Sequence, residues 1–210
     1  MEDSLQIINK DSLVESLKYL SKDKNIGALI KKYPIPNFSL NRNYFEALSK
    51  SIIYQQLSGK AAKVIFNRFL SLFDSETPCP LQYVNLNSSS LKETGLSRQK
   101  ISYISNLSTF FIENAHAINF AANTNEEIKY KLIGIKGIGQ WTVDMFLIFT
   151  LCRADVLPVG DLAIRKAFKE IYKLKDFPSN DFMNKEALRW KPYRSVAARY
   201  LWMFIDDIGV

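Results

Sequence analysis

The stretch that decides the fold is Leu132–Met145, which reads LIGIKGIGQWTVDM. An apolar helical pattern ends at Ile133, and three glycines follow before a second helical pattern begins near Gln140. This second pattern continues to about Leu151. Because glycine adopts the backbone dihedral angles that a tight turn needs, the stretch predicts two helices joined by a hairpin, over about residues 126–151.

The glycines of this hairpin suit the binding of phosphate. They let the backbone approach a phosphate closely, and the unpaired amides at the start of the next helix donate hydrogen bonds to it. Gly137-Ile138-Gly139 alone is a weak signal, since glycine turns join helices in many proteins. The good helices on both sides and the Trp141 that follows make it more specific. The segment therefore predicts contacts with a nucleic-acid backbone that do not depend on base sequence.

The composition is that of a folded, helix-rich chain. Of 210 residues, 47% are hydrophobic and 23% are charged, which excludes a largely disordered chain. Glycine and proline are few, with eight and seven residues, and alternating apolar runs bounded by turn residues are rare. We therefore expect an all-α fold, organised as one domain or as two lobes that share one core.

Capping and turn residues predict the helices outside the hairpin. The segment 77–80 contains two prolines and is expected to be a loop. Pro192 is expected as the first residue of a helix. Further helices are expected over 12–21, over 44–57 after Asn43, over 60–73 after Ser58 and Gly59, over 90–94 before Gly95, from Ser97 to about 114, and over 126–133 after Asn123 or Thr124.

The charge of the chain favours a polyanionic partner. Lys and Arg number 28 against 21 Asp and Glu, so the net charge is +7. The basic excess gathers at 42–73 and again at 165–175, whereas residues 1–41 are nearly neutral. Solvated helix faces also carry many lysines, so charge alone leaves both interpretations open.

Several classes of protein are not expected. No apolar run is long enough for a membrane span, and the acidic start, Met1–Ser4, is unlike a secretion signal. The two cysteines, Cys79 and Cys152, offer no disulfide framework, zinc site or iron–sulfur site. The single histidine, His116, lies outside every motif, so we expect no metal or triad chemistry from it. We expect an intracellular protein that is not secreted, cytoplasmic (nucleoid) in a bacterium or nuclear in a eukaryote.

A carboxylate follows the hairpin in a second informative stretch, Val156–Arg165, which reads VLPVGDLAIR. Asp161 comes after a Pro-x-Gly bend and opens a helix. One interpretation is an N-cap aspartate with only a structural role. The other is a carboxylate held ionised by the helix N-terminus, which would stabilise an oxocarbenium-like sugar while a base departs.

Together these segments resemble the helix–hairpin–helix (HhH-GPD) superfamily of DNA base-excision glycosylases. The pattern is Gly137–Thr142 (GIGQWT), with Asp161 placed 22 residues after Gly139. The alkylated-base branch, 3-methyladenine DNA glycosylase II, is the most similar. The segments that favour this branch are Ser51–Ser58 (SIIYQQLS), Val159–Arg165 (VGDLAIR) and Trp190–Trp202 (WKPYRSVAARYLW). The resemblance covers about residues 40–206 and implies a single glycosylase domain over 1–210, an all-α, two-lobed helical bundle with a cleft between the lobes.

The resemblance also implies an activity in base excision repair. A monofunctional enzyme would flip an alkylated purine, of the 3-methyladenine or 7-methylguanine type, out of double-stranded DNA and hydrolyse its N-glycosidic bond. We expect a monomer that needs no cofactor beyond a structural Na⁺ or K⁺ at the hairpin. The implied roles are Asp161 as the catalytic carboxylate; Trp141, Trp202 and Met145 in the base pocket; Leu57 and Gln56 as the DNA wedge; the amides of Gly137, Gly139 and Thr142 on a phosphate; and the carbonyls of Ile133, Ile135 and Ile138 on the cation.

Two positions bear on mechanism and specificity. Related enzymes that also cut the strand place a lysine nucleophile two residues after the second glycine of the hairpin, where this chain has Trp141, so no lyase activity is expected. Bacterial relatives often place a tyrosine where this chain has Met145, which cannot donate a hydroxyl hydrogen bond. Specificity for hypoxanthine or uracil, a DNA-binding protein without activity, and ordinary core packing of Leu57 and the tryptophans remain alternatives.

Overall fold

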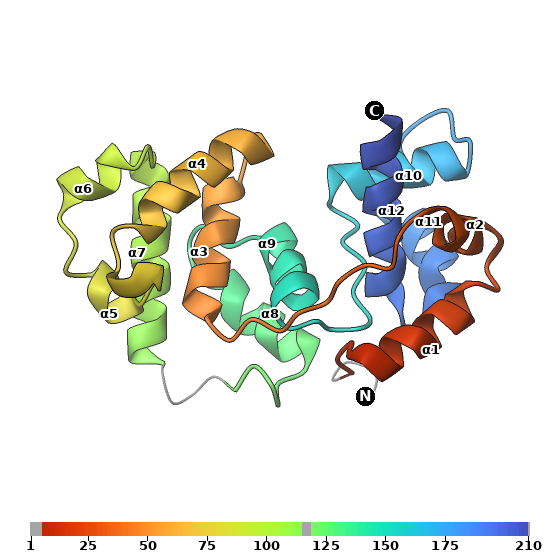
Figure 1. The fold of residues 1–210 in the computed structure, drawn as a ribbon, viewed down its shortest axis with the longest axis horizontal. Helices are drawn as coiled ribbons and strands as arrows, with labels where there is room; N and C mark the ends of the chain where they lie inside the picture. Colours follow the sequence, from red (N-terminus) through yellow and green to blue (C-terminus); the bar gives the residue numbers. More distant parts are fainter. Residues whose placement is uncertain (1–5, 115–118, 210) are drawn as a thin grey trace. The chain divides into compact units, whose positions relative to one another are not determined.

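The protein is described by a computed structural model that covers residues 6–114 and 119–209. His116 lies outside the described residues. Helices dominate the described chain, and its single β-bridge joins Ile7 and Arg153 (Figure 1). The chain divides into two compact units, a central unit of residues 41–146 and a terminal unit of residues 1–40 and 147–210. The all-α prediction is confirmed.

The central unit contains the hairpin. Its helix α3 packs against α4, α7 and α9, and α8 packs against α9. Large apolar side chains such as Phe45, Ile52 and Phe69 are buried in this unit. Its elements are α3 (Tyr44–Tyr54), α4 (Gly59–Leu70), the 3-10 turn η2 (Asp74–Glu76), α5 (Pro80–Tyr83), α6 (Ser88–Glu93), α7 (Arg98–Glu113), α8 (Asn125–Ile133) and α9 (Gln140–Met145).

The terminal unit is built around its last helix, α12 (Arg194–Ile208), against which α1, α2 and α10 pack (Figure 1). Its core includes Phe168, Trp190 and Tyr200, each almost fully buried. The other elements are α1 (Lys10–Leu20), α2 (Lys24–Lys32), α10 (Leu162–Ile171), α11 (Asn180–Glu186), the 3-10 turn η4 (Ala187–Trp190) and the π-helical turn η3 (Phe146–Thr150), whose first residue still belongs to the central unit.

The predicted caps are confirmed in the structure. Asn43, Ser58 and Ser97 each accept, through the side chain, a backbone amide of the first turn of their helix. Thr124 and Glu127 form a reciprocal capping box at α8. These contacts satisfy amides that otherwise have no partner within the helix, which is why such residues predict helix starts.

Two predictions around prolines were wrong in part. Pro80 is the first residue of α5 and not the end of a loop, because the fixed φ of proline fits a first helical turn and its missing amide has no intrahelical acceptor there. Pro192, in contrast, precedes the helix that it was expected to begin. The Lys191–Pro192 peptide bond is cis, Tyr193 is the N-cap and α12 begins at Arg194.

Helix α3 is shorter than predicted. It ends at Tyr54, because Gln55 leaves the helical conformation (φ −54°, ψ 130°) and Gln56 has a positive φ of 56°. The second helix of the hairpin changes its hydrogen-bonding pattern at Phe146 and continues as the π-helical turn to Thr150. No helix among the described residues is both long and apolar enough to cross a membrane.

Candidate active site

Asp161 is the N-cap of α10 and also contacts α12. Its Oδ1 accepts the backbone amide of Ile164 at 3.0 Å, which confirms the capping role. The same oxygen accepts a second hydrogen bond, from Nε1 of Trp202, at 3.0 Å. Capping a helix does not require the second bond. Its presence fixes the direction of the carboxylate relative to an aromatic ring.

Trp202 belongs to a group of partly exposed aromatic rings in the terminal unit. Its ring packs against Phe149, with centroids 5.3 Å apart and planes inclined by 33°. The guanidinium of Arg199, one helical turn earlier, lies 4.8 Å from the centre of the Phe149 ring. Phe149 is 42% exposed. The Arg199 guanidinium thus covers one face of Phe149, and the Trp202 ring is the aromatic surface bonded to the Asp161 carboxylate. An aromatic face next to a carboxylate suits a planar or cationic ligand.

Residues 154–156, which precede Asp161, form an ion pair and hydrogen bonds with the start of α12. Arg194 and Asp155 form a two-pronged ion pair, with Nε–Oδ1 and Nη2–Oδ2 distances of 2.6 and 2.8 Å. The amide of Ser195 donates to the Ala154 carbonyl, and the Ser195 hydroxyl accepts the amide of Val156. These contacts hold the backbone before Asp161 in one place.

The hairpin between α8 and α9 forms as predicted. Gly137 has φ +105°, a conformation that other residues rarely adopt, whereas Gly139 has an ordinary φ of −102° and is the N-cap of α9. The amide of Ile138 donates to the Ile135 carbonyl at 3.0 Å and closes the turn. A Cβ atom built on Gly139 meets nothing within 4 Å, so this part of the hairpin is open.

The turn between α3 and α4 exposes the predicted wedge residues. Leu57 is 39% exposed and is therefore not a core residue, and Gln56 is also exposed. The preceding Gln55 points its amide at the hairpin, where Nε2 donates to the Gly137 carbonyl at 3.0 Å and to Thr142 Oγ1 at 3.2 Å. We name residues 55–57 the wedge turn.

The other predicted pocket residues lie on α9 in the central unit. Trp141 is partly exposed, and Met145, one turn further along the helix, is largely buried. Thr142 is also buried, beneath the bond from Gln55. The residues predicted for one base pocket thus come from both units, and the structure joins Trp202 directly to Asp161 by a hydrogen bond.

Two charged groups near the hairpin were not predicted from the sequence. Asp144 is buried in α9 and accepts a 2.6 Å hydrogen bond from Gln140, and burial raises the pKa of its carboxyl to about 6. Lys100 of α7 donates to the carbonyls of Ile53, in α3, and Gln55, the residue after α3, and burial lowers the pKa of its ammonium. The four-residue spacing of Gln140 and Asp144 was an available signal, since such residues meet on a helix surface.

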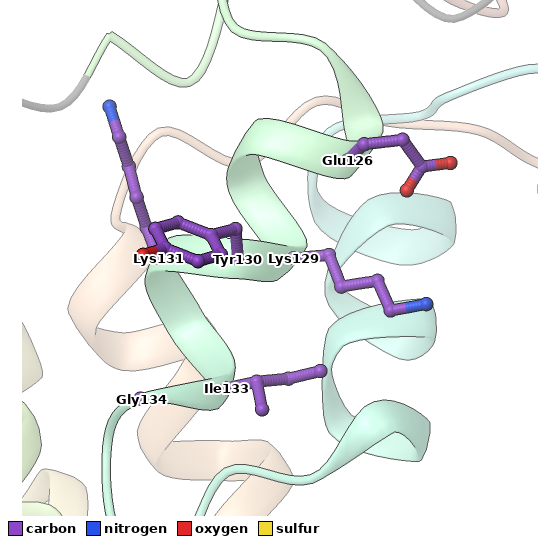
Figure 2. Close-up of a pocket in the computed structure, with 6 residues that line it drawn as sticks. All are labelled: Glu126, Lys129, Tyr130, Lys131, Ile133 and Gly134. Carbon is purple, nitrogen blue, oxygen red and sulfur yellow. The ribbon is translucent and has the colours of Figure 1, made fainter.

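A hollow lies on α8. Figure 2 shows that Glu126, Lys129 and Ile133 extend from one side of the helix. Tyr130 is 85% exposed, so the hollow is open to solvent. None of the predicted base-pocket residues lines it. Within residues 6–114 and 119–209, no group of three or more His, Cys, Asp or Glu side chains could hold a metal ion.

Comparisons with known proteins identify the family of this chain. Residues 49–192 match the model of the HhH-GPD superfamily base excision DNA repair proteins. The "DNA-3-methyladenine glycosylase 1" of Schizosaccharomyces pombe is 34% identical, over 95% of this chain and 92% of its own. The "DNA-3-methyladenine glycosylase" of Saccharomyces cerevisiae is 30% identical, over 96% of this chain and 69% of its own.

Solved structures give the same assignment. The S. pombe 3-methyladenine DNA glycosylase, solved in complex with abasic DNA, matches with a TM-score of 0.82 and 33% identity, over 91% of this chain and 97% of its own. A DNA-3-methyladenine glycosidase from Bacillus halodurans matches with a TM-score of 0.79 and 30% identity, over 97% of this chain and 94% of its own. The chain belongs to the HhH-GPD superfamily of base excision DNA repair proteins.

Proposed function

We propose that this protein is a monofunctional DNA glycosylase that removes alkylated purines, of the 3-methyladenine or 7-methylguanine type, from double-stranded DNA. The observation that carries the proposal is the Asp161 carboxylate, held by the Ile164 amide and by the Trp202 indole, whose partly exposed ring packs against the exposed Phe149. A protein that only grips phosphates has no use for a carboxylate fixed in this way.

The chemistry assigned to Asp161 is electrostatic. As the bond between the sugar C1′ and the base nitrogen breaks, its electron pair leaves with the base and positive charge develops on the sugar. A fixed carboxylate stabilises that charge without reorganising, and water then adds at C1′ and gives up one proton to the solvent. A cationic alkylated base leaves as a neutral molecule, so protonation of the leaving base is not needed.

The base pocket assigned to the enzyme is aromatic. Trp141 and Trp202 are partly exposed and offer faces for stacking on a flipped purine, and a cationic purine gains from cation–π attraction. Met145 packs as a soft apolar surface and donates no hydroxyl hydrogen bond. This combination favours bases selected by charge and shape over bases selected by hydrogen bonds.

The wedge turn and the hairpin are assigned to DNA. Leu57, with Gln56, fills the gap that the flipped base leaves, which fits the exposure of both side chains. The amides of Gly137, Gly139 and Thr142 hold a phosphate, and the open surface at Gly139 gives that phosphate room.

We assign a monovalent cation to the main-chain oxygens of the hairpin. The carbonyls of Ile133, Ile135 and Ile138 are the proposed ligands, and carbonyl oxygens suit hard cations such as Na⁺ or K⁺. The Ile135 carbonyl already accepts the Ile138 amide, so the turn itself sets its direction. We assign the cation a structural role and propose no further cofactor. The enzyme is taken to act as a monomer inside the cell, where its DNA substrate lies.

Lyase activity is not part of the proposal. Trp141 stands where related enzymes that cut the strand place their lysine nucleophile. Lys100, which is partly buried near the hairpin, is engaged with two backbone carbonyls. Borohydride should therefore trap no covalent complex with DNA, and a trapped complex would contradict a water-using mechanism.

The deciding experiment measures base release from methylated DNA by the wild type and by Asp161→Asn. Asparagine is also a good N-cap, so the variant should fold normally while losing the negative charge. We expect release of 3-methyladenine or 7-methylguanine by the wild type and at least about 100-fold slower release by the variant. Parallel substrates containing hypoxanthine or uracil test the alternative specificities. Absence of any base release by the wild type would favour a protein that only binds DNA.

A further inference from the structure

We propose that Lys100 is a positioning residue that holds the wedge turn and the hairpin as one rigid DNA-binding unit. The inference rests on the proposed function, because it assigns the wedge turn to base flipping. It concerns α7, a helix to which the sequence motifs assign no role. The contacts that carry it all lie within the central unit.

Lys100 closes the end of α3. Its Nζ donates to the carbonyl of Ile53 at 2.7 Å and to the carbonyl of Gln55 at 2.9 Å. The last carbonyls of a helix have no partner within the helix and carry partial negative charge, so an ammonium is a favourable partner. Because Gln55 is the first residue of the wedge turn, this contact fixes the point at which the chain leaves α3.

Gln55 then joins the wedge turn to the hairpin. Its side-chain amide donates to the Gly137 carbonyl at 3.0 Å and to the Thr142 hydroxyl at 3.2 Å. The backbone of Gln55 is thus held by Lys100 while its side chain is held by the hairpin. A shift of either DNA-binding element would have to break contacts with the other.

The same helix also supports the hairpin directly. The Tyr103 ring lies so close to Gly137 that a Cβ atom there would come within 2.2 Å of the ring. The side-chain amide of Asn106 donates to the Lys136 carbonyl at 3.4 Å. Lys100, Tyr103 and Asn106 follow one another at three-residue intervals, which places them along one side of α7.

This arrangement has a consequence for flipping. Wedge insertion pushes on the exposed Leu57, and the adjacent Gln56 already has a positive φ. Without Lys100, two carbonyls at the end of α3 lose their donor and the wedge turn loses one of its two anchors. The hairpin keeps its own glycines, so initial phosphate binding should change little while the flipping step slows.

The test compares Lys100→Met, which keeps the length and loses the charge, with Lys100→Arg, which retains donors for both carbonyls. The control is Lys92→Met, on the exposed end of α6. Single-turnover base release at saturating DNA should fall about 10-fold in Lys100→Met, recover at least in part in Lys100→Arg, and remain unchanged in the control. The Kd for undamaged duplex should change less than about 2-fold in all three.

A double variant separates a role through the wedge from a general loss of stability. If Lys100 acts through Leu57, then Lys100→Met should add little to the rate loss of Leu57→Ala. If the rate losses of the two single variants multiply in the double variant, the proposal is overturned. An unchanged rate in Lys100→Met, or a failure of Lys100→Arg to recover any rate, would also overturn it. Circular dichroism and thermal melting identify a variant that is not folded, and Lys100→Arg then decides alone.

A second measurement does not depend on base release. Fluorescence of 2-aminopurine placed opposite or next to an abasic site reports how the wedge turn enters the stack. Lys100→Met should reduce the fluorescence change of the wild type, and an equal change in both proteins would contradict the proposal. If the wild type releases no base but shows the fluorescence change, and Lys100→Met reduces that change, the proposed function fails while the role of Lys100 stands.

Discussion

Nε1 of Trp202 and Oδ1 of Asp161, from residues 41 positions apart in the sequence, lie 3.0 Å apart and form a hydrogen bond. The same oxygen accepts the Ile164 amide from the first turn of α10. Two donors from two helices therefore fix one oxygen of the carboxylate. The N-cap contact is therefore compatible with the catalytic role that we propose for Asp161, because it helps to fix the direction of the carboxylate.

Trp202→Phe should separate the hydrogen bond from the aromatic surface. Phenylalanine keeps a ring against Phe149 but has no donor for Asp161. Since a hydrogen bond to a charged group contributes about 1.5–3 kcal/mol, we expect base release to slow roughly 10- to 100-fold. Single-turnover kinetics at saturating DNA measures this rate. A rate equal to that of the wild type would show that the Ile164 amide is enough to orient the carboxylate.

Substitution by alanine should have different effects at the two hairpin glycines, Gly137 and Gly139. Gly137→Ala places a methyl group within 2.2 Å of the Tyr103 ring at a φ of +105°, so it should lower the free energy of unfolding by roughly 2–4 kcal/mol. Gly139→Ala meets no atom within 4 Å and has an ordinary φ. It should keep the stability of the wild type but weaken DNA binding, because its methyl group occupies the space assigned to a phosphate.

Urea unfolding and DNA binding distinguish the two glycine variants. The expected pattern is lost stability in Gly137→Ala, and normal stability with a Kd raised about 10-fold in Gly139→Ala. Normal DNA binding by Gly139→Ala would argue against the phosphate site at this position. Equal stability of both variants would contradict the contact between Gly137 and Tyr103.

Local chemistry made much of the fold predictable. Ser97 and Thr124 mark helix starts because each side chain accepts an amide only a few residues away. Helix α2 was not predicted, and Gly27 in its interior explains why. A Cβ atom on Gly27 would lie 2.4 Å from the Ser21 carbonyl, so close approach of the chain requires a residue that disfavours helices. Helix propensity along the sequence does not show where close packing of the chain requires a glycine.

The candidate site, like the fold, was predictable only where the signal lies within one stretch of sequence. Asp161 could be found because the hairpin, the bend and the aspartate follow one another along the chain. Lys100 and Gln55 could not, since their partners lie 45 to 87 residues away and contact them only after folding. A lysine at a polar helix position has no feature that predicts a partner of this kind. The residues that connect the wedge turn to α7 and to the hairpin are thus the least visible in the sequence.

The ion pair between Asp155 and Arg194 should be important for stability. Both side chains are largely buried, and removal of one partner leaves the other charge without compensation. Asp155→Ala should therefore lower the free energy of unfolding by about 3 kcal/mol. The matched control is Asp207→Ala, which breaks an exposed pair with Lys32 and should leave the unfolding midpoint unchanged. Equal effects of both variants would show that burial does not strengthen the first pair.

Asp144 should make stability depend on pH. Burial raises the pKa of its carboxyl from an ordinary value of 3.8 to about 6, so between these values the folded protein binds more protons than the unfolded chain. This group therefore lowers the free energy of unfolding as pH rises through the interval, and its full penalty, up to about 3 kcal/mol, is present above pH 6.

Asp144→Asn removes this penalty while it keeps an oxygen that can accept the hydrogen bond from Gln140. We expect the variant to be more stable than the wild type at pH 7.5 and equally stable near pH 4, as measured by urea unfolding at several pH values. Gln140→Leu is the matching change on the other side of the bond. It should raise the pKa of Asp144 further, because that hydrogen bond lowers the pKa. A difference between Asp144→Asn and the wild type that stays constant from pH 4 to 7.5 would exclude titration of Asp144 as its cause.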